Sequence, residues 1–172
     1  MLPRLFASAL LLMAALAAGI ARAEDDPDLI FKKSTVFRLL SPDAKLAVYA
    51  IDDPIVEGVA CHFTLPEIGG WKGWAGLAEE TSDASLACRQ IGPIQFKEKF
   101  EQGELAFRKR RSLFFKKVQI VRGCDAKRNV LVYLMYTDKL VEGSPKNSTS
   151  TVPIMPWGAD SNPPRCGDWL KG

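Results

Sequence analysis

The chain contains a single histidine, so any histidine-based catalysis must use His62. A serine hydrolase would pair this imidazole with Ser82 or Ser144 as the nucleophile and with Asp52 or Asp83 as the orienting acid. Neither serine lies in the Gly-x-Ser-x-Gly sequence of a nucleophile elbow. The simpler interpretation of His62 is therefore a surface or strand residue, and no catalytic residue is assigned.

Four cysteines form the second group with chemical potential. Cys61, Cys88, Cys124 and Cys166 are spaced by 27, 36 and 42 residues, and no two of them form a Cys-x-x-Cys pair. A zinc site needs closer ligand pairs and a reactive dithiol needs neighbouring thiols, so this spacing favours two structural disulfides. Three connectivities are possible. Pairing Cys61 with Cys88 and Cys124 with Cys166 closes two loops of moderate length and is preferred.

A glycine-rich stretch that contains Trp71, Lys72 and Trp74 is a candidate binding loop. Backbone N–H groups of such a loop, with a lysine beside them, can bind an anion, and an exposed tryptophan pair can contact a sugar or a peptide. The glycine spacing matches neither the dinucleotide fingerprint nor the phosphate loop, and ordinary loop geometry also explains it. Together with Lys146 and Asn147 of a later loop, these residues form the candidate binding surface.

Residues 108–117 carry six basic side chains, near acids at Glu98, Glu101 and Glu104. Such a run of charge is usually a solvated edge that discourages pairing between sheets of different molecules. The alternative is docking to an anionic surface, such as lipid headgroups of the cell envelope, or to an acidic protein.

The first 23 residues have the pattern of a secretory signal peptide. Arg4 precedes an apolar stretch over residues 5–20, and Ala21-Arg22-Ala23 provides a small-x-small cleavage site. An apolar stretch of 16 residues is shorter than the roughly 20 that span a bilayer, and no cysteine follows the cleavage site, as a lipoprotein would require. We expect cleavage after Ala23, no transmembrane segment in the mature protein and a periplasmic location.

Cleavage would change the charge of the protein. Removal of residues 1–23 takes away Arg4 and Arg22 and no acid, so the formal net charge falls from +3 to +1. A nearly neutral exported protein lacks the positive field that nucleic-acid binding needs. The remaining chain, about 149 residues long, is the size of one domain with one hydrophobic core.

The elements that must position these residues are mainly strands. Residues 35–40 and 46–51 are rich in β-branched, aromatic and aliphatic side chains, and Ser41-Pro42-Asp43-Ala44 between them favours a tight turn. This pattern predicts a β-hairpin. Asp52-Asp53-Pro54 follows it, and paired acids beside a proline are ordinary turn residues, although they are also possible cation ligands or general acids and bases.

Two further runs predict strands that carry the first cysteine pair. Residues 59–65 alternate apolar and polar side chains, which directs Cys61 inward, and residues 84–91 place Cys88 on one face in the same way. A disulfide between these cysteines would therefore tie two strands together through the core.

The most hydrophobic pair of runs is at residues 112–122 and 129–139, with a turn at residues 125–128. The second run is apolar on both faces, which is typical of a strand in the middle of a sheet or between packed layers. In the first run, Phe114-Phe115-Lys116-Lys117 puts a lysine on each face of the strand. A β-bulge there would shift the register and so explain the pattern.

Helical content is expected to be low, with about two turns at residues 74–80 and two more at residues 94–102. From Pro153 onward the chain is rich in proline and reads as a loop-like extension. The sequence therefore predicts a single, mainly β domain, an antiparallel β-sandwich or partly open barrel with one or two short helices.

Several short motifs together identify a family resemblance. They are Asp52-Asp53-Pro54, Gly69-Gly70 with Lys72-Gly73, Leu77-Ala78-Glu79, Thr81-Ser82-Asp83-Ala84, residues 107–116, Val121-Arg122, residues 125–129, residues 141–147 and residues 152–157. From about Ser34 to Trp157 the chain resembles the CreA family of bacterial periplasmic proteins. The resemblance implies a small exported protein of unestablished molecular function.

The resemblance also bears on the disulfides. Cys61 and Cys88 fall at positions that match the family pattern, whereas Cys124 and Cys166 look like additions to it. Two added cysteines are most simply partners of each other, which supports the connectivity preferred from loop length. The expected organisation is a cleaved leader, a CreA-like domain at residues 24–157 and a C-terminal extension at residues 158–172.

These observations predict a non-enzymatic periplasmic protein that acts as a binding or accessory protein of the cell envelope. It is expected to be a monomer with no cofactor and no metal, and its partner is an unidentified envelope protein or an anionic surface. Two alternatives remain open: a hydrolase-like enzyme that uses His62 and loop carboxylates, and a thiol-redox protein that uses Cys124 and Cys166.

Overall fold

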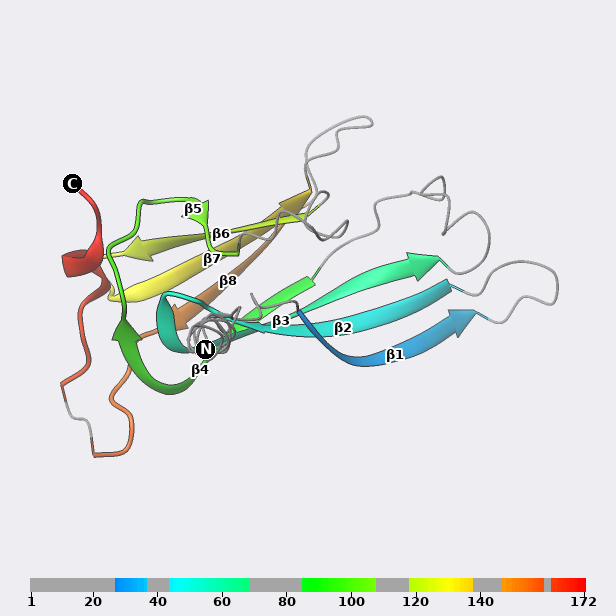
Figure 1. Cartoon of the computed structure of the whole chain (residues 1–172), viewed down its shortest axis with the longest axis horizontal. Helices are drawn as coiled ribbons and strands as arrows, with labels where there is room; N and C mark the ends of the chain where they lie inside the picture. The colour runs from blue at the N-terminus through cyan, green and yellow to red at the C-terminus, as the bar shows by residue number, and fades with distance from the viewer. Residues whose placement is uncertain (1–26, 37–43, 69–84, 108–117, 138–146, 160–161) are drawn as a thin grey trace, which may run out of the picture.

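The described part of the chain is mainly β-sheet, as the sequence predicts (Figure 1). The computed structural model describes residues 27–36, 44–68, 85–107, 118–137, 147–159 and 162–172. The elements are β1 (Asp28–Val36), β2 (Ala44–Asp52), β3 (Val56–Ile68), β4 (Ser85–Phe96), β5 (Glu104–Leu105), β6 (Val118–Asp125), β7 (Val130–Thr137), β8 (Asn147–Pro153) and a 3-10 helix, η2 (Cys166–Trp169). Within the described ranges, no helix is long and apolar enough to cross a membrane.

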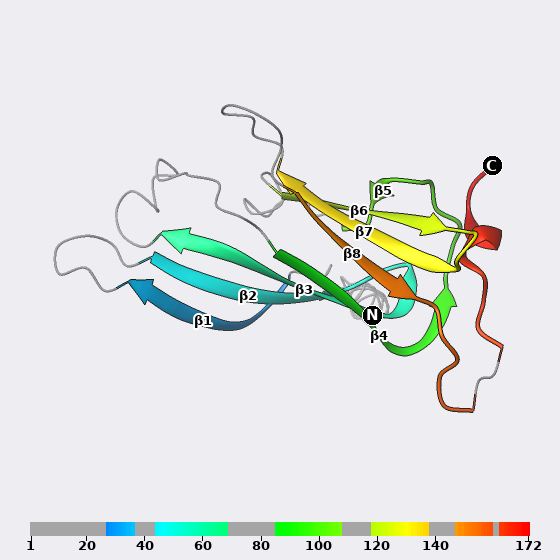
Figure 2. The same ribbon diagram turned by 180° about the vertical axis from the view of Figure 1, so that it is seen from behind.

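The strands form two four-stranded antiparallel sheets, in the orders β1-β2-β3-β4 and β5-β6-β7-β8. Figures 1 and 2 show the two sheets as separate layers from opposite sides. They do not close into a barrel. The predicted mainly β, antiparallel architecture is therefore confirmed in the form of two sheets, and all neighbouring strands within each sheet are consecutive in sequence.

Alternating side chains of both sheets make the core between them. In β6 every second residue is buried, and in β7 the buried face consists of Leu131, Tyr133 and Met135. β7 lies between β6 and β8, which is the interior position that its two apolar faces predict. Across the core, β3 contributes Val59, Cys61 and Phe63.

Side chains join the adjoining strands of the two sheets, β4 and β8. The Ser150 hydroxyl accepts the Cys88 backbone N–H at 2.8 Å, and the Ser148 hydroxyl accepts the Leu86 backbone N–H at 3.2 Å. The backbone N–H groups of Leu86 and Cys88 on β4 thus donate to serine side chains of β8, and not to backbone carbonyls of that strand. This arrangement satisfies buried donors while leaving the two sheets separate.

The N-terminal sheet confirms the first disulfide and contains a β1–β2 hairpin, of whose predicted first strand at residues 35–40 only residues 35–36 are described. β1 pairs with β2 and begins at Asp28, before the predicted start, while the connecting turn lies outside the described residues. Cys61 and Cys88 are directly opposite each other in the register of β3 and β4, both are fully buried, and they form a disulfide.

The second disulfide, Cys124–Cys166, fastens the C-terminal extension to the end of β6. The Asn129 side chain supports the same junction, because its amide donates to the Pro164 carbonyl at 3.1 Å and its carbonyl accepts the Cys166 N–H at 2.9 Å. Both disulfides of the preferred connectivity are therefore confirmed. The extension is loop-like apart from η2, which the sequence did not predict.

The extension also pairs with the segment that follows β4. The Phe100 N–H donates to the Trp169 carbonyl at 3.0 Å, and the Lys171 N–H donates to the Phe100 carbonyl at 2.9 Å. Phe96 stacks on Trp169 with a centroid separation of 5.2 Å and on Phe100 at 6.1 Å. These contacts hold the Phe100 side chain in the hydrophobic core, where it is fully buried.

The predicted helix at residues 94–102 is wrong. Ile94 and Phe96 are the last part of β4, where residues two apart are buried on one face, and Phe100 uses its backbone to pair with the C-terminal extension. Tertiary pairing therefore overrides a weak local helical preference. The predicted helix at residues 74–80 and the bulge at residues 114–117 lie outside the described residues.

Candidate functional site

A buried ion cluster lies between the two sheets. The Arg122 Nη1 donates to both carboxylate oxygens of Asp53, at 2.7 and 2.6 Å, and the Tyr133 hydroxyl donates to the same carboxylate at 2.7 Å. The Asp53 side chain is fully buried and the Arg122 side chain is 1% exposed. We therefore treat these three residues, the inter-sheet cluster, as the first candidate site.

Strand register brings two members of the cluster together. Arg122 of β6 is directly opposite Tyr133 of β7, so both side chains point to the core face of the same sheet. Asp53 arrives from the other sheet, immediately after β2. Its Oδ1 accepts the backbone N–H groups of Ile55 and Val56, each at 3.0 Å, in the turn that the sequence predicts.

The guanidinium of Arg122 has further partners at the edge of the core. Its Nη2 donates to Glu104 of β5 at 2.7 Å, and its carbon lies 4.9 Å from the centre of the Phe100 ring. Glu104 in turn lies 3.8 Å from the Lys171 ammonium of the extension. The Arg122 Nε has no hydrogen-bond partner among the described residues.

The environment of Tyr133 keeps its phenol neutral. Burial raises the pKa of Tyr133 well above its ordinary value, and the negative charge of Asp53, with the hydrogen bond to it, raises this pKa further; Arg122 opposes the shift. Tyr133 therefore acts as a hydrogen-bond donor to Asp53 at any physiological pH. It cannot act as a base there.

The inter-sheet cluster is closed to a substrate. The carboxylate of Asp53 receives four donors, namely two backbone N–H groups, one guanidinium nitrogen and one phenol, and solvent does not reach it. A general acid or base must be within hydrogen-bond reach of the substrate group whose proton it transfers, and the buried carboxylate of Asp53 does not meet this requirement. The geometry supports a structural link between the sheets. Among the described residues, no group of acids, cysteines and histidine is arranged to hold a metal.

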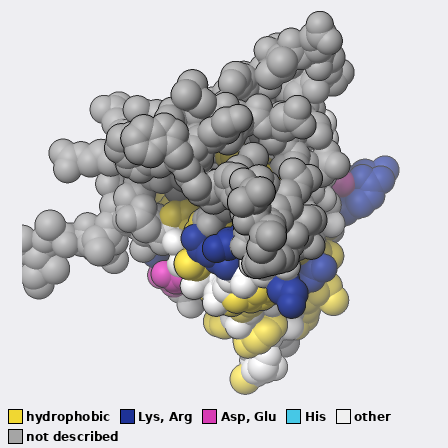
Figure 3. Space-filling view, turned by 90° about the vertical axis from the view of Figure 1, so that its right-hand side faces the viewer, with side chains coloured by type: hydrophobic (Ala, Val, Ile, Leu, Met, Phe, Trp, Pro, Cys, Tyr) yellow, Lys and Arg dark blue, Asp and Glu magenta, His cyan; other side chains and the backbone are white. Residues whose placement is uncertain are grey.

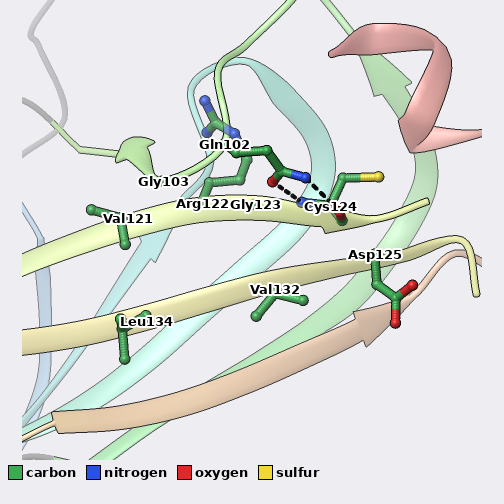
Figure 4. A pocket seen from close by; sticks show the side chains of 9 residues that line it. All are labelled: Gln102, Gly103, Val121, Arg122, Gly123, Cys124, Asp125, Val132 and Leu134. Atoms are coloured by element: carbon green, nitrogen blue, oxygen red, sulfur yellow. Dashed lines mark hydrogen bonds between the residues drawn. The ribbon is translucent and has the colours of Figure 1, made fainter. Parts of the chain in front are cut away.

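An open depression of about 300 Å³ lies on the other face of β6 and β7. Figure 4 shows Val121, Val132 and Leu134 along it, with Gln102 above β6. The Gln102 amide donates to the Cys124 carbonyl and accepts the Cys124 N–H, both at 2.8 Å. Two charged residues contribute to the wall, and each is bound within the protein: Arg122 to Asp53 and Glu104, and Asp125 to Arg128 at 2.7 Å. The depression therefore offers a small, mainly apolar surface.

Most of the predicted binding surface falls outside the described residues. This applies to Trp71, Lys72, Trp74 and Lys146. Asn147 is exposed at the start of β8, where it is opposite Tyr136. The assignment of these residues to one surface therefore stays a prediction, as does the role of the basic segment 108–117.

His62 is exposed on β3, and its cross-strand neighbours are Ala50 and Ala87. Within the described part of the chain, no carboxylate forms a hydrogen bond with it. Asp52 is exposed, while Asp53 points into the core and is bound to Arg122. The described carboxylates thus give no support to a hydrolase that uses His62.

Sequence reasoning missed the inter-sheet cluster. It interpreted Asp53 as a turn residue and gave Arg122 and Tyr133 no role. One signal was present: β6 alternates buried residues, and Arg122 occupies the same face as Ile120 and Cys124. A charged residue on a core-facing position needs a buried partner, and this pattern predicts that one exists. It does not reveal which acid provides it.

The fold and the cluster define a class: an antiparallel two-sheet protein with two disulfides and a closed ion cluster between its sheets. Comparison with known proteins gives the family. Residues 30–157 match the family described as CreA protein. Protein CreA of Escherichia coli strain K12 is 51% identical over 142 residues, which cover 80% of this chain and 88% of the relative.

The CreA proteins of Escherichia coli O6:H1 (strain CFT073) and O157:H7 match with the same identity and coverage. No solved structure matches the chain. The chain belongs to the CreA family, and the resemblance read from its motifs is confirmed.

Proposed function

We propose that this protein is exported to the periplasm and acts there as a non-enzymatic binding or accessory protein of the cell envelope. The observation that carries the proposal is the state of the cysteines, because all four are joined in two disulfides. Disulfides persist in oxidising compartments and are rare in the cytosol. Residues 1–23, with their small-x-small site, provide the matching export signal.

The described polar chemistry favours binding over catalysis. Asp53, Arg122 and Tyr133 are used within the fold, where they link the sheets. His62 is exposed without a carboxylate partner among the described residues. A role that depends on contact with another molecule therefore fits the chain better than a reaction at these groups.

Export is tested by expressing the full chain in a bacterial host and separating periplasm from cytoplasm. We expect a periplasmic protein whose N-terminal residue is Glu24 and which has no free thiol under denaturing, non-reducing conditions. The control variant Leu11→Arg interrupts the apolar stretch and should leave the protein uncleaved in the cytoplasm. An uncleaved, reduced cytoplasmic wild-type protein would contradict the proposal.

The binding surface is proposed to include Trp71, Lys72, Trp74, Lys146 and Asn147. Chemical crosslinking in intact cells, followed by purification, should recover a reproducible partner with the wild-type protein. The double variant Trp74→Ala/Lys146→Ala should lose that partner. The control Lys127→Ala, at an exposed turn residue, should retain it. Equal recovery by all three proteins would remove this surface from the proposal.

A further inference from the structure

The edge strand β1 exposes three successive apolar side chains. Leu29, Ile30 and Phe31 are 49%, 52% and 55% exposed. A half-buried strand normally exposes every second residue, whereas here both faces of the strand present apolar groups. Single exposed apolar residues are ordinary, but a contiguous set marks an interaction surface.

The register extends this surface onto β2. Phe31 is opposite Val48 and Lys33 is opposite Leu46, which is itself 39% exposed. Cross-strand neighbours share a face of the sheet, so Phe31 and Leu46 lie on one face with Lys33 beside them. We call Phe31, Lys33 and Leu46 the β1–β2 patch.

Charge is divided along this hairpin. Lys32, Lys33 and Lys45 lie toward the end where β1 finishes and β2 begins, whereas Asp28 and Asp52 lie toward the opposite end. Side-chain alternation places only Lys33 on the face of Phe31 and Leu46, and it places Lys32 and Lys45 on the other face of the sheet. Figure 3 views the molecule from the side at which β1 ends and shows basic side chains among apolar ones. The apolar side chains of the patch thus have the positive charge of Lys33 beside them at this end, which complements an anionic partner.

The backbone of β1 disfavours a partner that adds a strand. The pairing of β1 with β2 is shifted between Leu29 and Phe31 and again between Ser34 and Val36. Bulges of this kind interrupt the regular spacing of backbone groups and are a common protection of edge strands against further pairing. Contact through side chains is therefore favoured over β-strand addition.

We propose that the β1–β2 patch binds the surface of an anionic phospholipid bilayer, an inference that rests on the proposed export to the periplasm. Phe31 and Leu46 enter the headgroup region, as apolar side chains of interfacial segments do. Lys33 keeps its ammonium at the level of the phosphates while its methylene groups lie along the apolar surface.

The test is flotation of the purified protein with phosphatidylcholine vesicles that contain or lack phosphatidylglycerol. Binding should require phosphatidylglycerol and should fall as salt is raised. Phe31→Ser and Leu46→Ser should each weaken it by about tenfold, since each removes exposed apolar area. Lys33→Glu should weaken it by about thirtyfold, because two units of charge near the surface are changed.

Matched controls come from other strands and turns. Ile91→Ser removes an apolar side chain that is 54% exposed on β4, and Lys127→Glu reverses an exposed charge in the turn after β6. Both should bind like the wild-type protein. All variants are compared in the same processed form, with equal midpoints of thermal unfolding as evidence of folding.

Several results would overturn the inference. These are equal binding to both kinds of vesicle, no binding to either, or patch variants that bind like the wild-type protein. Sedimentation that shows a dimer lost in Phe31→Ser, without vesicle binding, would assign the patch to self-association instead. If the protein is periplasmic but does not bind vesicles, only this inference fails; if it is not exported, the proposed function fails regardless of vesicle binding.

Discussion

Replacing Asp53 by asparagine tests whether the inter-sheet cluster holds the two layers together. The substitution keeps the size of the side chain, and its carbonyl can still accept the two backbone N–H groups of the turn. It removes the charge opposite Arg122 and presents an amide N–H₂ where the carboxylate now accepts Arg122 or Tyr133. Removing one partner of a buried ion pair typically costs about 3 to 5 kcal/mol, and we expect about 3 kcal/mol because part of the turn survives.

The measurement is equilibrium unfolding in urea with both disulfides intact, followed by circular dichroism. Asp52→Asn is a closely matched control, because it removes the same charge from the adjacent, exposed residue. It should change the free energy of unfolding by less than about 0.5 kcal/mol. Combining Asp53→Asn with Arg122→Met should cost less than the sum of the single changes, since the two residues are directly coupled.

A loss of less than about 1 kcal/mol for Asp53→Asn would refute this reasoning, because that is the range of an exposed ion pair. Additive effects of the two substitutions would do the same. Either result would mean that the cluster is solvated or rearranged in solution and does not join the sheets.

Three further predictions concern the buried Tyr133, the Ser150 hydrogen bond between the sheets and the disulfide of the C-terminal extension. The folded pKa of Tyr133 lies above the unfolded value of about 10, so its contribution to stability is complete below about pH 10 and is lost as the pH rises toward the folded pKa. Urea unfolding at a series of pH values above 10 should show a decrease in the unfolding free energy. In Tyr133→Phe this decrease with pH should be smaller. Ser150→Ala leaves a buried backbone N–H of β4 without its acceptor and should cost about 1 to 3 kcal/mol in urea unfolding, whereas Thr151→Ala, at an exposed residue of the same strand, should cost much less. Cys166→Ser opens a loop of 42 residues and should lower the unfolding free energy by about 4 kcal/mol in the chain-entropy model, with faster proteolysis of the extension; unchanged proteolysis would show that the extension is held without its bond to Cys124.

Local patterns predicted most of the strands because these strands have short-range periodicity. Residues 59–65 alternate, and Cys61 is buried as that alternation requires. The apolar run at residues 129–139 became β7, in the interior of its sheet. At residues 94–102 the alternation is confined to Ile94-Gln95-Phe96-Lys97, and two pairings decided the conformation: Phe96 pairs with β3, and Phe100 pairs with the C-terminal extension.

The cysteine pairing was also within reach of the sequence. Loop lengths and the match of Cys61 and Cys88 to the family pattern selected one of three connectivities, and the structure has that one. The proposed binding surface was harder to predict from the sequence, because residues such as Lys72 and Lys146 carry no periodic pattern that assigns them to one place.

The sequence by itself determined the class of the molecule, which is a mainly β domain with two disulfides that belongs to the CreA family, and it predicts a signal peptide at residues 1–23. These features depend on composition, local periodicity and short motifs, all of which are local in the chain. Only the tertiary structure decided that Asp53 meets Arg122 and Tyr133, which lie 69 and 80 residues away. Asp52 and Asp53 are equivalent in type and neighbours in sequence, yet one is solvated and the other is buried between the sheets. The packing of one sheet on the other makes that difference, because it determines which carboxylate loses its water and must find a buried cation.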